Sequence, residues 1–402
     1  MATFFLIIIY LSFISLGLPD SLLGVSWPLM QLDLKAPFEA AGVISMTITG
    51  GAILSSLVSG IVIQRLGTGK VTFISCLITA SSLLGFSFAP SLFWLLLLAV
   101  PLGLGAGSVD SALNNYVATH YKARHMSWLH CFWGVGATMG PIIMSQFIAK
   151  ENSWRNGYLA VSELQFMLAV LLCFTLPLWN RVGKNSNNNQ ANVSVAEEER
   201  IITPKEITGK VKPLQIAGVK LALASFFFYC GVEATIGLWG SSFLVNMKEM
   251  PPALAAQWVG LYYAGITIGR LITGFITMKI SNTILIRMGQ ITALIGAALL
   301  LLPLPTIFSL VGFIMIGLGC APIFPCMLHE TPLRFGIENS QKIMGYQMAT
   351  GYIGSTFLPA ILGLIASHTT MMMLPFFALL YIVAMLISSE KINVLINNRK
   401  GG

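Results

Sequence analysis

The amino-acid sequence predicts an all-α membrane protein with twelve transmembrane helices, arranged as two pseudo-symmetric six-helix bundles. Of its 402 residues, 55% are hydrophobic and only 9% are charged, which is too few charges to cover a water-exposed surface. The hydrophobic residues also occur in blocks of about twenty or more, the length that crosses a hydrocarbon layer roughly 30 Å thick. In addition, short residue patterns of the first half of the chain recur in the second half.

The twelve spans are obtained by dividing the chain at charged residues, Pro-Gly clusters and polar turns. In the first half we expect them near 3–30, 40–64, 70–89, 91–119, 126–149 and 159–180. In the second half we expect them near 215–246, 254–278, 283–303, 306–331, 342–366 and 371–389. We expect the first span to be retained rather than cleaved as a signal peptide, because it lacks a basic leader and carries Asp20.

A long polar stretch begins at Arg181 and contains the run Asn185–Gln190 and the acidic cluster Glu197–Glu199. Such a composition does not bury a core. The sequence therefore predicts an N-terminal six-helix bundle over 1–182, a cytoplasmic linker over 183–214 and a C-terminal six-helix bundle over 215–402.

The orientation follows from the basic residues, because positively charged loops stay cytoplasmic. Placing the amino terminus inside leaves only four basic loop residues outside, namely Lys35, Lys150, Arg155 and Lys248. We therefore expect a multi-pass protein of the cell (inner) membrane with both termini cytoplasmic. The net charge of +8 is then a sign of topology and not of nucleic-acid binding.

Residues of the two halves recur at an offset near 213 to 218, which indicates an internal repeat. Asp20 is followed four residues later by Gly24, and Glu233 is followed four residues later by Gly237. The other matching pairs, first half before second, are Gly51 with Gly265, Gly60 with Gly274, Gly103 with Gly317, Gly136 with Gly354 and Pro141 with Pro359.

A six-plus-six arrangement with a long central loop resembles the major facilitator superfamily. The stretch Gly60-Ile-Val-Ile-Gln-Arg65-Leu-Gly67-Thr-Gly-Lys70 is similar to the loop motif between spans two and three of that superfamily, with Gln64 in place of its usual Asp. The resemblance gives Gly60, Arg65 and Gly67 a structural or gating role.

Within the superfamily, three segments resemble fucose-permease-like symporters, which carry fucose, galactose or glucose with protons. They are Asp20 in span one, Asp110 with Asn114 in span four, and Leu129-His-Cys-Phe-Trp-Gly-Val-Gly136 in span five. The resemblance implicates the acids of spans one and four in proton coupling and substrate recognition.

Three acidic residues lie deep within predicted spans: Asp20, Asp110 and Glu233. An ionised carboxylate in hydrocarbon costs several kcal/mol, so each must face a cavity, find a partner or stay protonated. We expect these residues to take part in proton coupling. Two alternatives stay open: Asp110 joins helices by a hydrogen bond, or Glu233 pairs with Arg270, which is otherwise placed to brace a contact between the halves.

Asp110 shares one helical face with Gly103, Gly107 and Asn114, by their i, i+3 and i+4 spacing. Small residues on that face allow a close helix approach, and the acid and amide are suited to hydrogen-bond a hydroxylated solute.

Sugar sites combine aromatic rings with amides and acids. The substrate-binding candidates are Asn114, Asn115, His130, Trp133, Gln165, Tyr229, Trp239, Tyr262, Gln347 and Tyr352, although membrane aromatics also commonly anchor at interfaces. Further structural or gating candidates are Gly136, Pro141 and Arg270. Prolines at 19, 141, 322 and 325 are expected to interrupt the backbone hydrogen bonds of their spans, as gates or as permanent bends.

No phosphate-binding glycine loop and no paired metal-ligand spacing occur in the sequence, so we expect neither an enzyme nor a cofactor. The six cysteines are expected to be buried packing residues. The predicted function is uptake of a neutral sugar or similar polyhydroxylated solute, by a monomer in the lipid bilayer and driven by protons or Na⁺. The alternatives are efflux of drugs or lipophilic cations, and a non-transporting solute receptor.

Overall fold

The structure is a computed structural model that describes residues 2–120, 123–197, 213–277 and 279–400. Within these ranges, 12 helical segments are long and apolar enough to cross a membrane, and the all-helical class expected from composition is confirmed. The N-terminal helices are α1 (Ala2–Asp20), α2 (Leu22–Asp33), α3 (Ala40–Leu66), α4 (Thr68–Ser87), α5 (Leu92–His120), α6 (Ala123–Glu151) and α7 (Trp154–Glu197). A short 3-10 helix, η1 (Pro213–Gln215), precedes α8 (Val219–Lys248), α9 (Pro252–Ile276), α10 (Asn282–Leu301), α11 (Ile307–Cys320), α12 (Ile323–Phe335), α13 (Ile337–His368) and α14 (Met373–Lys400).

The first and tenth spans are each built from two consecutive helices. Span one breaks at Ser21, directly after Pro19 and Asp20, and span ten breaks between Cys320 and Ile323, at Pro322. Proline lacks the backbone N–H that continues a helical ladder, and the expected interruptions at these two sites are confirmed. Pro141, by contrast, lies inside the continuous helix α6.

Helix α7 extends well beyond the predicted sixth span. It continues through polar residues to Glu197, so residues 183–197, which we expected in an unpacked linker, are helical. No glycine or proline occurs between Lys184 and Glu197, and adding residues to an existing helix avoids the cost of nucleation. The rest of the polar stretch, 198–212, lies outside the described residues.

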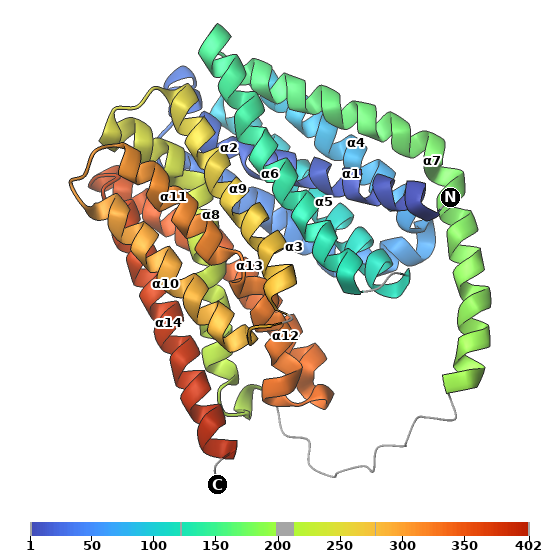
Figure 1. Cartoon of the computed structure of the whole chain (residues 1–402). Coiled ribbons are helices and arrows are strands. Elements are labelled where there is room, and N and C mark those ends of the chain that lie inside the picture. Colours follow the sequence, from blue (N-terminus) through green and yellow to red (C-terminus); the bar gives the residue numbers. More distant parts are fainter. Residues whose placement is uncertain (1, 121–122, 198–212, 278, 401–402) are drawn as a thin grey trace.

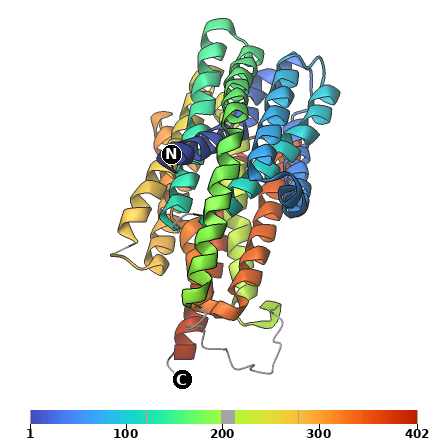
Figure 2. The same cartoon turned by 90° about the vertical axis from the view of Figure 1, so that its right-hand side faces the viewer.

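The helices form two groups (Figure 1). Helices α1–α7 form one group and α8–α14 the other, and the two groups diverge toward the end of the molecule where α7 ends and α8 begins and converge at the opposite end. In the view turned by 90°, most helices of both groups run along one common direction (Figure 2), as expected for membrane-spanning segments.

Equivalent glycines pack the two groups in the same way. In the first group Gly51 of α3 meets the backbone of α5 at Val100 and Gly103, and in the second Gly265 of α9 meets the backbone of α11 at Ile314 and Gly317. Small residues allow such close backbone approach between membrane helices. The recurrence seen in the sequence therefore reflects one helix contact that is built twice.

The cysteines only partly follow the prediction. Cys76, Cys320 and Cys326 are buried, whereas Cys173 is exposed. Its neighbour Phe174 is 80% exposed, so this face of α7 looks outward. An exposed apolar face needs no burial within the protein when lipid surrounds it, and for that reason the expectation for Cys173 was wrong.

Candidate functional site

Asp20 lies at the end of α1, where span one breaks, and its side chain is exposed. The indole Nε1 of Trp133, on α6, donates a hydrogen bond to Asp20 Oδ2 at 2.7 Å. The two helices approach closely because Gly17 of α1 and Gly136 of α6 each lie against the backbone of the other helix. Gly136 thus has a structural place beside the site.

Glu233 of α8 and Arg270 of α9 form an ion pair, with 3.5 Å between Arg270 Nη2 and Glu233 Oε2. The Tyr229 hydroxyl donates to the same carboxylate oxygen, and Arg270 Nη2 donates to the Tyr229 hydroxyl at 3.3 Å. The Tyr262 hydroxyl donates to the backbone oxygen of Glu233 at 3.2 Å. The sequence left this pairing open, and the structure contains it.

Trp133 joins these two groups across the boundary between the halves. The guanidinium carbon of Arg270 lies 5.3 Å from the centroid of the Trp133 ring, within the range of a cation–π contact. Tyr263 of α9 meets the same ring edge-on, with 6.4 Å between centroids. Arg270 therefore pairs with Glu233 and also braces the halves, the two roles that the sequence presented as alternatives.

Asp110 and Asn114 form a second polar group, on α5. Asn114 Nδ2 donates to Asp110 Oδ1 at 2.8 Å. Gly103 and Gly107, two turns and one turn earlier on the same face, lie against the backbone of α3 at Ile48 and Ala52. The shared face predicted from the spacing is therefore confirmed, and the small residues do admit a close neighbouring helix.

Other candidates lie around these two groups. Tyr352 of α13 lies near Ser56 and close enough to Asp110 to interact electrostatically with it. Asn115 is exposed. His130 is half-buried between Phe13 of its own half and Phe324 of the other, at centroid distances of 5.9 and 6.4 Å. Tyr352 and His130 therefore lie close to the boundary between the halves.

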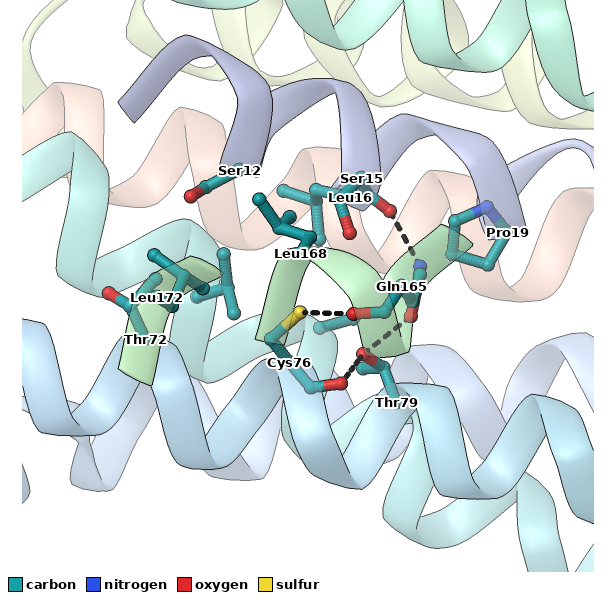
Figure 3. A pocket seen from close by; sticks show the side chains of 12 residues that line it. Ser12, Ser15, Leu16, Pro19, Thr72, Cys76, Thr79, Gln165, Leu168 and Leu172 are labelled. Atoms are coloured by element: carbon teal, nitrogen blue, oxygen red, sulfur yellow. Dashed lines mark hydrogen bonds between the residues drawn. The ribbon is translucent and has the colours of Figure 1, made fainter. Parts of the chain in front are cut away.

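Gln165 lies within the N-terminal group, beside Ser15, Cys76 and Thr79 (Figure 3). Its amide donates to the Ser15 backbone oxygen at 2.7 Å, and its carbonyl accepts from the Thr79 hydroxyl at 2.9 Å. The side chain is 1% exposed and borders a small cavity between α1, α4, α5 and α7. Gln165 thus ties three helices of one half together.

The polar groups of two more candidates are also engaged within their own half. Gln347 accepts from the Thr331 hydroxyl at 2.9 Å and is 1% exposed. Trp239 donates to the Pro359 backbone oxygen at 2.7 Å, while its ring stacks on Phe38 of the other half, with 4.8 Å between centroids. The structure does not bring these two side chains to the acids.

The glycine and proline candidates lie on helix surfaces and turns. Gly67 has a φ of +81° in the turn between α3 and α4, a backbone conformation that favours glycine. Arg65 is exposed, and the space beside Gly60 is open. Pro141 of α6 lies against Gly260 of α9, on the boundary between the halves.

Sequence reasoning missed Phe38 and Phe324, which contact Trp239 and His130. Both belong to a set of 24 phenylalanines, and no spacing distinguishes them from lipid-facing aromatics. The local feature that marks Phe324 in the sequence is its position between Pro322 and Pro325.

The chain is similar in sequence to several known proteins. It is 25% identical over 283 residues to the glucose/mannose transporter GlcP of Bacillus subtilis, an alignment that covers 69% of this chain and 67% of that protein. It is 25% identical over 312 residues to the bypass of stop codon protein 6 of Saccharomyces cerevisiae, covering 70% of this chain and 60% of that protein.

Solved structures share the fold at low sequence identity. The inward open conformation of the xylose transporter XylE from E. coli matches with a TM-score of 0.75 at 12% identity, covering 98% of this chain and 95% of that one. A point mutant of the nucleoside transporter NupG matches with a TM-score of 0.72 at 16% identity, covering 96% of this chain and 98% of that one. Residues 9–359 match the model of the Major Facilitator Superfamily, and the chain therefore belongs to this family of membrane transporters, which are not enzymes.

Proposed function

We propose that this protein is a proton-coupled transporter that takes up a neutral sugar or similar polyhydroxylated solute by alternating access. The observation that carries the proposal is the exposed carboxylate of Asp20 at the break in span one, hydrogen-bonded to the Trp133 indole. A carboxylate beside an aromatic ring is a combination suited to a sugar, because the acid accepts from hydroxyls while the ring packs on C–H faces.

The second polar group supports the same substrate class. Asp110 and Asn114 together offer acceptors and a donor, and Tyr352 adds a hydroxyl from the other half. Arg270, the cation of the site, is engaged by Glu233, which disfavours an anionic substrate. The names of the similar proteins, a glucose/mannose transporter and a xylose transporter, agree with a sugar.

Proton coupling is proposed for the acids because each lies within a membrane span. Asp20 is exposed, whereas Glu233 is held by Arg270 and Tyr229. Asp20 and Asp110 are therefore the better candidates to bind and release a proton, and Glu233 is the better candidate for a structural pair. With both termini and the linker on the cytoplasmic side, the divergence of the halves toward the linker (Figure 1) corresponds to an inward-facing arrangement.

Efflux of lipophilic cations is the second candidate, since Asp20 lies close enough to Asp110 and Glu233 to interact with both, and of these three acids Glu233 is the one that pairs with an arginine among the described residues. A cation is attracted to uncompensated carboxylates. Sugar uptake is the better proposal because Asn114 and the Trp133 indole offer hydrogen-bond donors, for which a lipophilic cation has no use.

The test is transport by the purified protein in proteoliposomes with an imposed pH gradient. Glucose, mannose and xylose would be offered as labelled solutes, with ethidium as the cationic probe. We expect one of the sugars to accumulate when the uptake side is acidic, and a protonophore to abolish the accumulation. Proton-driven movement of ethidium without sugar flux would support efflux instead. Binding of a sugar, seen as a raised melting temperature without flux of any probe, would support a receptor.

A further inference from the structure

We propose that Trp133 is a positioning residue that couples the state of Asp20 to the contact between the two halves. A proton or a sugar hydroxyl arriving at Asp20 releases the indole, and the released indole no longer holds Arg270. The inference rests on the proposed function, since it explains how a proton or substrate on one half alters the other.

The first part of the argument is that Trp133 uses two different surfaces at once. Its single N–H donates to Asp20 of α1, with 2.7 Å between Trp133 Nε1 and Asp20 Oδ2. Its ring face contacts Arg270 of α9, with 5.3 Å between the guanidinium carbon and the ring centroid. Indole has no other hydrogen-bond donor. A change at Asp20 that turns the indole therefore also changes the ring face offered to Arg270.

The second part is the strength of the hydrogen bond to Asp20. A bond from an N–H to an ionised carboxylate is about twice as strong as a neutral one. Protonation of Asp20 therefore weakens the contact, and a sugar hydroxyl competes with it directly. Either event favours rotation of the indole away from α1.

The third part is that Arg270 has a second arrangement available. Its contact with Glu233 is a single, long one of 3.5 Å, and its Nε is buried without a hydrogen-bond partner. A guanidinium commonly binds a carboxylate through two parallel hydrogen bonds. Arg270 freed from Trp133 gains a hydrogen-bond partner by closing onto Glu233, within its own half. The chain of contacts thus has two distinct arrangements, as a switch requires.

The fourth part is the position of Trp133 within the contact between α6 and α9. The neighbouring Gly134 lies against Thr267, and Pro141 lies against Gly260. Trp133 and Arg270 are therefore close to the surface along which the halves meet. A rearrangement there acts on the contact itself and needs no path through other helices.

Several other ionisable groups interact electrostatically with Asp20, namely Asp110 of α5, Glu233 of α8, Tyr263 of α9 and Tyr352 of α13. Arg270 of α9 lies against the Trp133 ring, and His130 of α6 interacts electrostatically with Arg270. Among the described residues, the indole N–H donates to Asp20. Because a change of pH acts on all of these groups, a pH response of the Trp133 fluorescence is assigned to Asp20 by substituting Asp20.

The first experiment is a fluorescence titration of the purified full-length protein between pH 4 and 9, without substrate. The signal of Trp133 is obtained as the difference between wild type and Trp133→Phe, which keeps an aromatic ring but removes the N–H. We expect a pH-dependent transition in this difference, lost when the same pair is compared in an Asp20→Asn background and shifted in an Arg270→Gln background. A transition that is unchanged in the Asp20→Asn background, or the absence of any transition, would overturn the inference.

The second experiment measures coupling with the sugar that the wild type accumulates. The ratio of proton-driven accumulation to counterflow is expected to fall about tenfold in Trp133→Phe and further in Trp133→Leu, which also removes the ring. Trp94→Phe is the matched control, because Trp94 is 46% exposed on α5 and stacks edge-on against Phe93. An unaltered ratio in Trp133→Phe would contradict the coupling role.

The two experiments separate this inference from the proposed function. The fluorescence transition needs no substrate, so it supports the coupling role even when the wild type carries none of the sugars. Sugar accumulation that stays fully proton-coupled in Trp133→Leu would leave the proposed function standing and remove the role of Trp133.

Discussion

At the scale of single residues, each of the three acids proposed for proton coupling has a specific partner. Asp20 accepts from Trp133, Asp110 accepts from Asn114, and Glu233 pairs with Arg270 and Tyr229. Burying a charge without such partners costs several kcal/mol. The partners differ in kind, because a neutral donor allows the acid to lose its charge, whereas a cation stabilises the charged form. For this reason we propose Asp20 and Asp110, and not Glu233, as proton carriers.

The first prediction concerns Asp110. Asp110→Asn keeps the shape and part of the hydrogen bonding with Asn114 but removes the titrating group. If Asp110 carries the proton, uphill accumulation in proteoliposomes is lost while counterflow persists. If Asp110 only joins helices, the substitution lowers stability by about 1 kcal/mol and leaves coupling intact in the folded protein.

Asp20→Asn is the companion variant, measured in the same pair of assays at matched protein amounts. Equal loss of accumulation and counterflow in either variant would indicate a binding or structural role for that acid. Full uphill transport by Asp110→Asn would end the proton-carrier hypothesis for this residue.

At the scale of helices, glycines determine where the two halves meet. Gly24 of α2 lies against the backbone of Gly237 and Leu238 in α8, and Gly42 of α3 lies against Ala360 of α13. Gly24 and Gly237 are equivalent positions of the internal repeat. Their contact therefore joins the same element of both halves, at the end away from the linker where the halves converge (Figure 1).

The second prediction concerns this contact. A side chain at position 24 would overlap the backbone of α8, so Gly24→Val is expected to keep the halves apart at the converging end. With the native cysteines replaced and Thr138→Cys introduced on α6, labelling by an impermeant thiol reagent added outside intact cells is expected to rise about tenfold.

Gly60→Ala is the control, because an added methyl group at Gly60 meets no atom within 4 Å. It should leave the labelling rate of the cysteine introduced by Thr138→Cys unaltered. Equal labelling in Gly24→Val and in the parent protein would show that the Gly24 contact does not hold the converging end closed.

At the scale of the whole molecule, charged residues distinguish the two faces of the protein. Arg155 pairs with Asp33 at 2.9 Å at the end away from the linker. Arg287 pairs with Glu390, and Arg334 with Glu330, on helices of the C-terminal group. Lys and Arg are concentrated in the loops of the linker end, and from the positive-inside rule we propose that this end is cytoplasmic.

The third prediction tests this topology. A specific protease site inserted between Glu199 and Lys205 should be cut in inside-out membrane vesicles and remain intact in whole cells. The same site inserted between Glu151 and Trp154, in the turn between α6 and α7, should show the opposite behaviour. Cleavage of the first site in intact cells would invert the proposed orientation.

The sequence by itself determined the number of spans, the internal repeat and the helical face that Asp110 and Asn114 share. Hydrophobic length reports directly on a membrane crossing. Residues four apart on a helix are neighbours whatever surrounds them, and for this reason the Asp110–Asn114 hydrogen bond was within reach of sequence reasoning. The breaks near Pro19 and Pro322 follow equally from a local property, the missing backbone N–H.

Only the tertiary structure decided which polar side chains serve the boundary between the halves and which serve one half alone. In the sequence, three other candidates look as suitable for binding a substrate as His130 or Trp133: Gln165, Gln347 and Trp239. The polar groups of these three side chains nevertheless form hydrogen bonds within a single half. The link from Asp20 through Trp133 to Arg270 joins residues more than a hundred positions apart. Membrane helices are apolar on most faces, so hydrophobic periodicity does not reveal which face meets which neighbour, and the packing of close glycine contacts makes that choice.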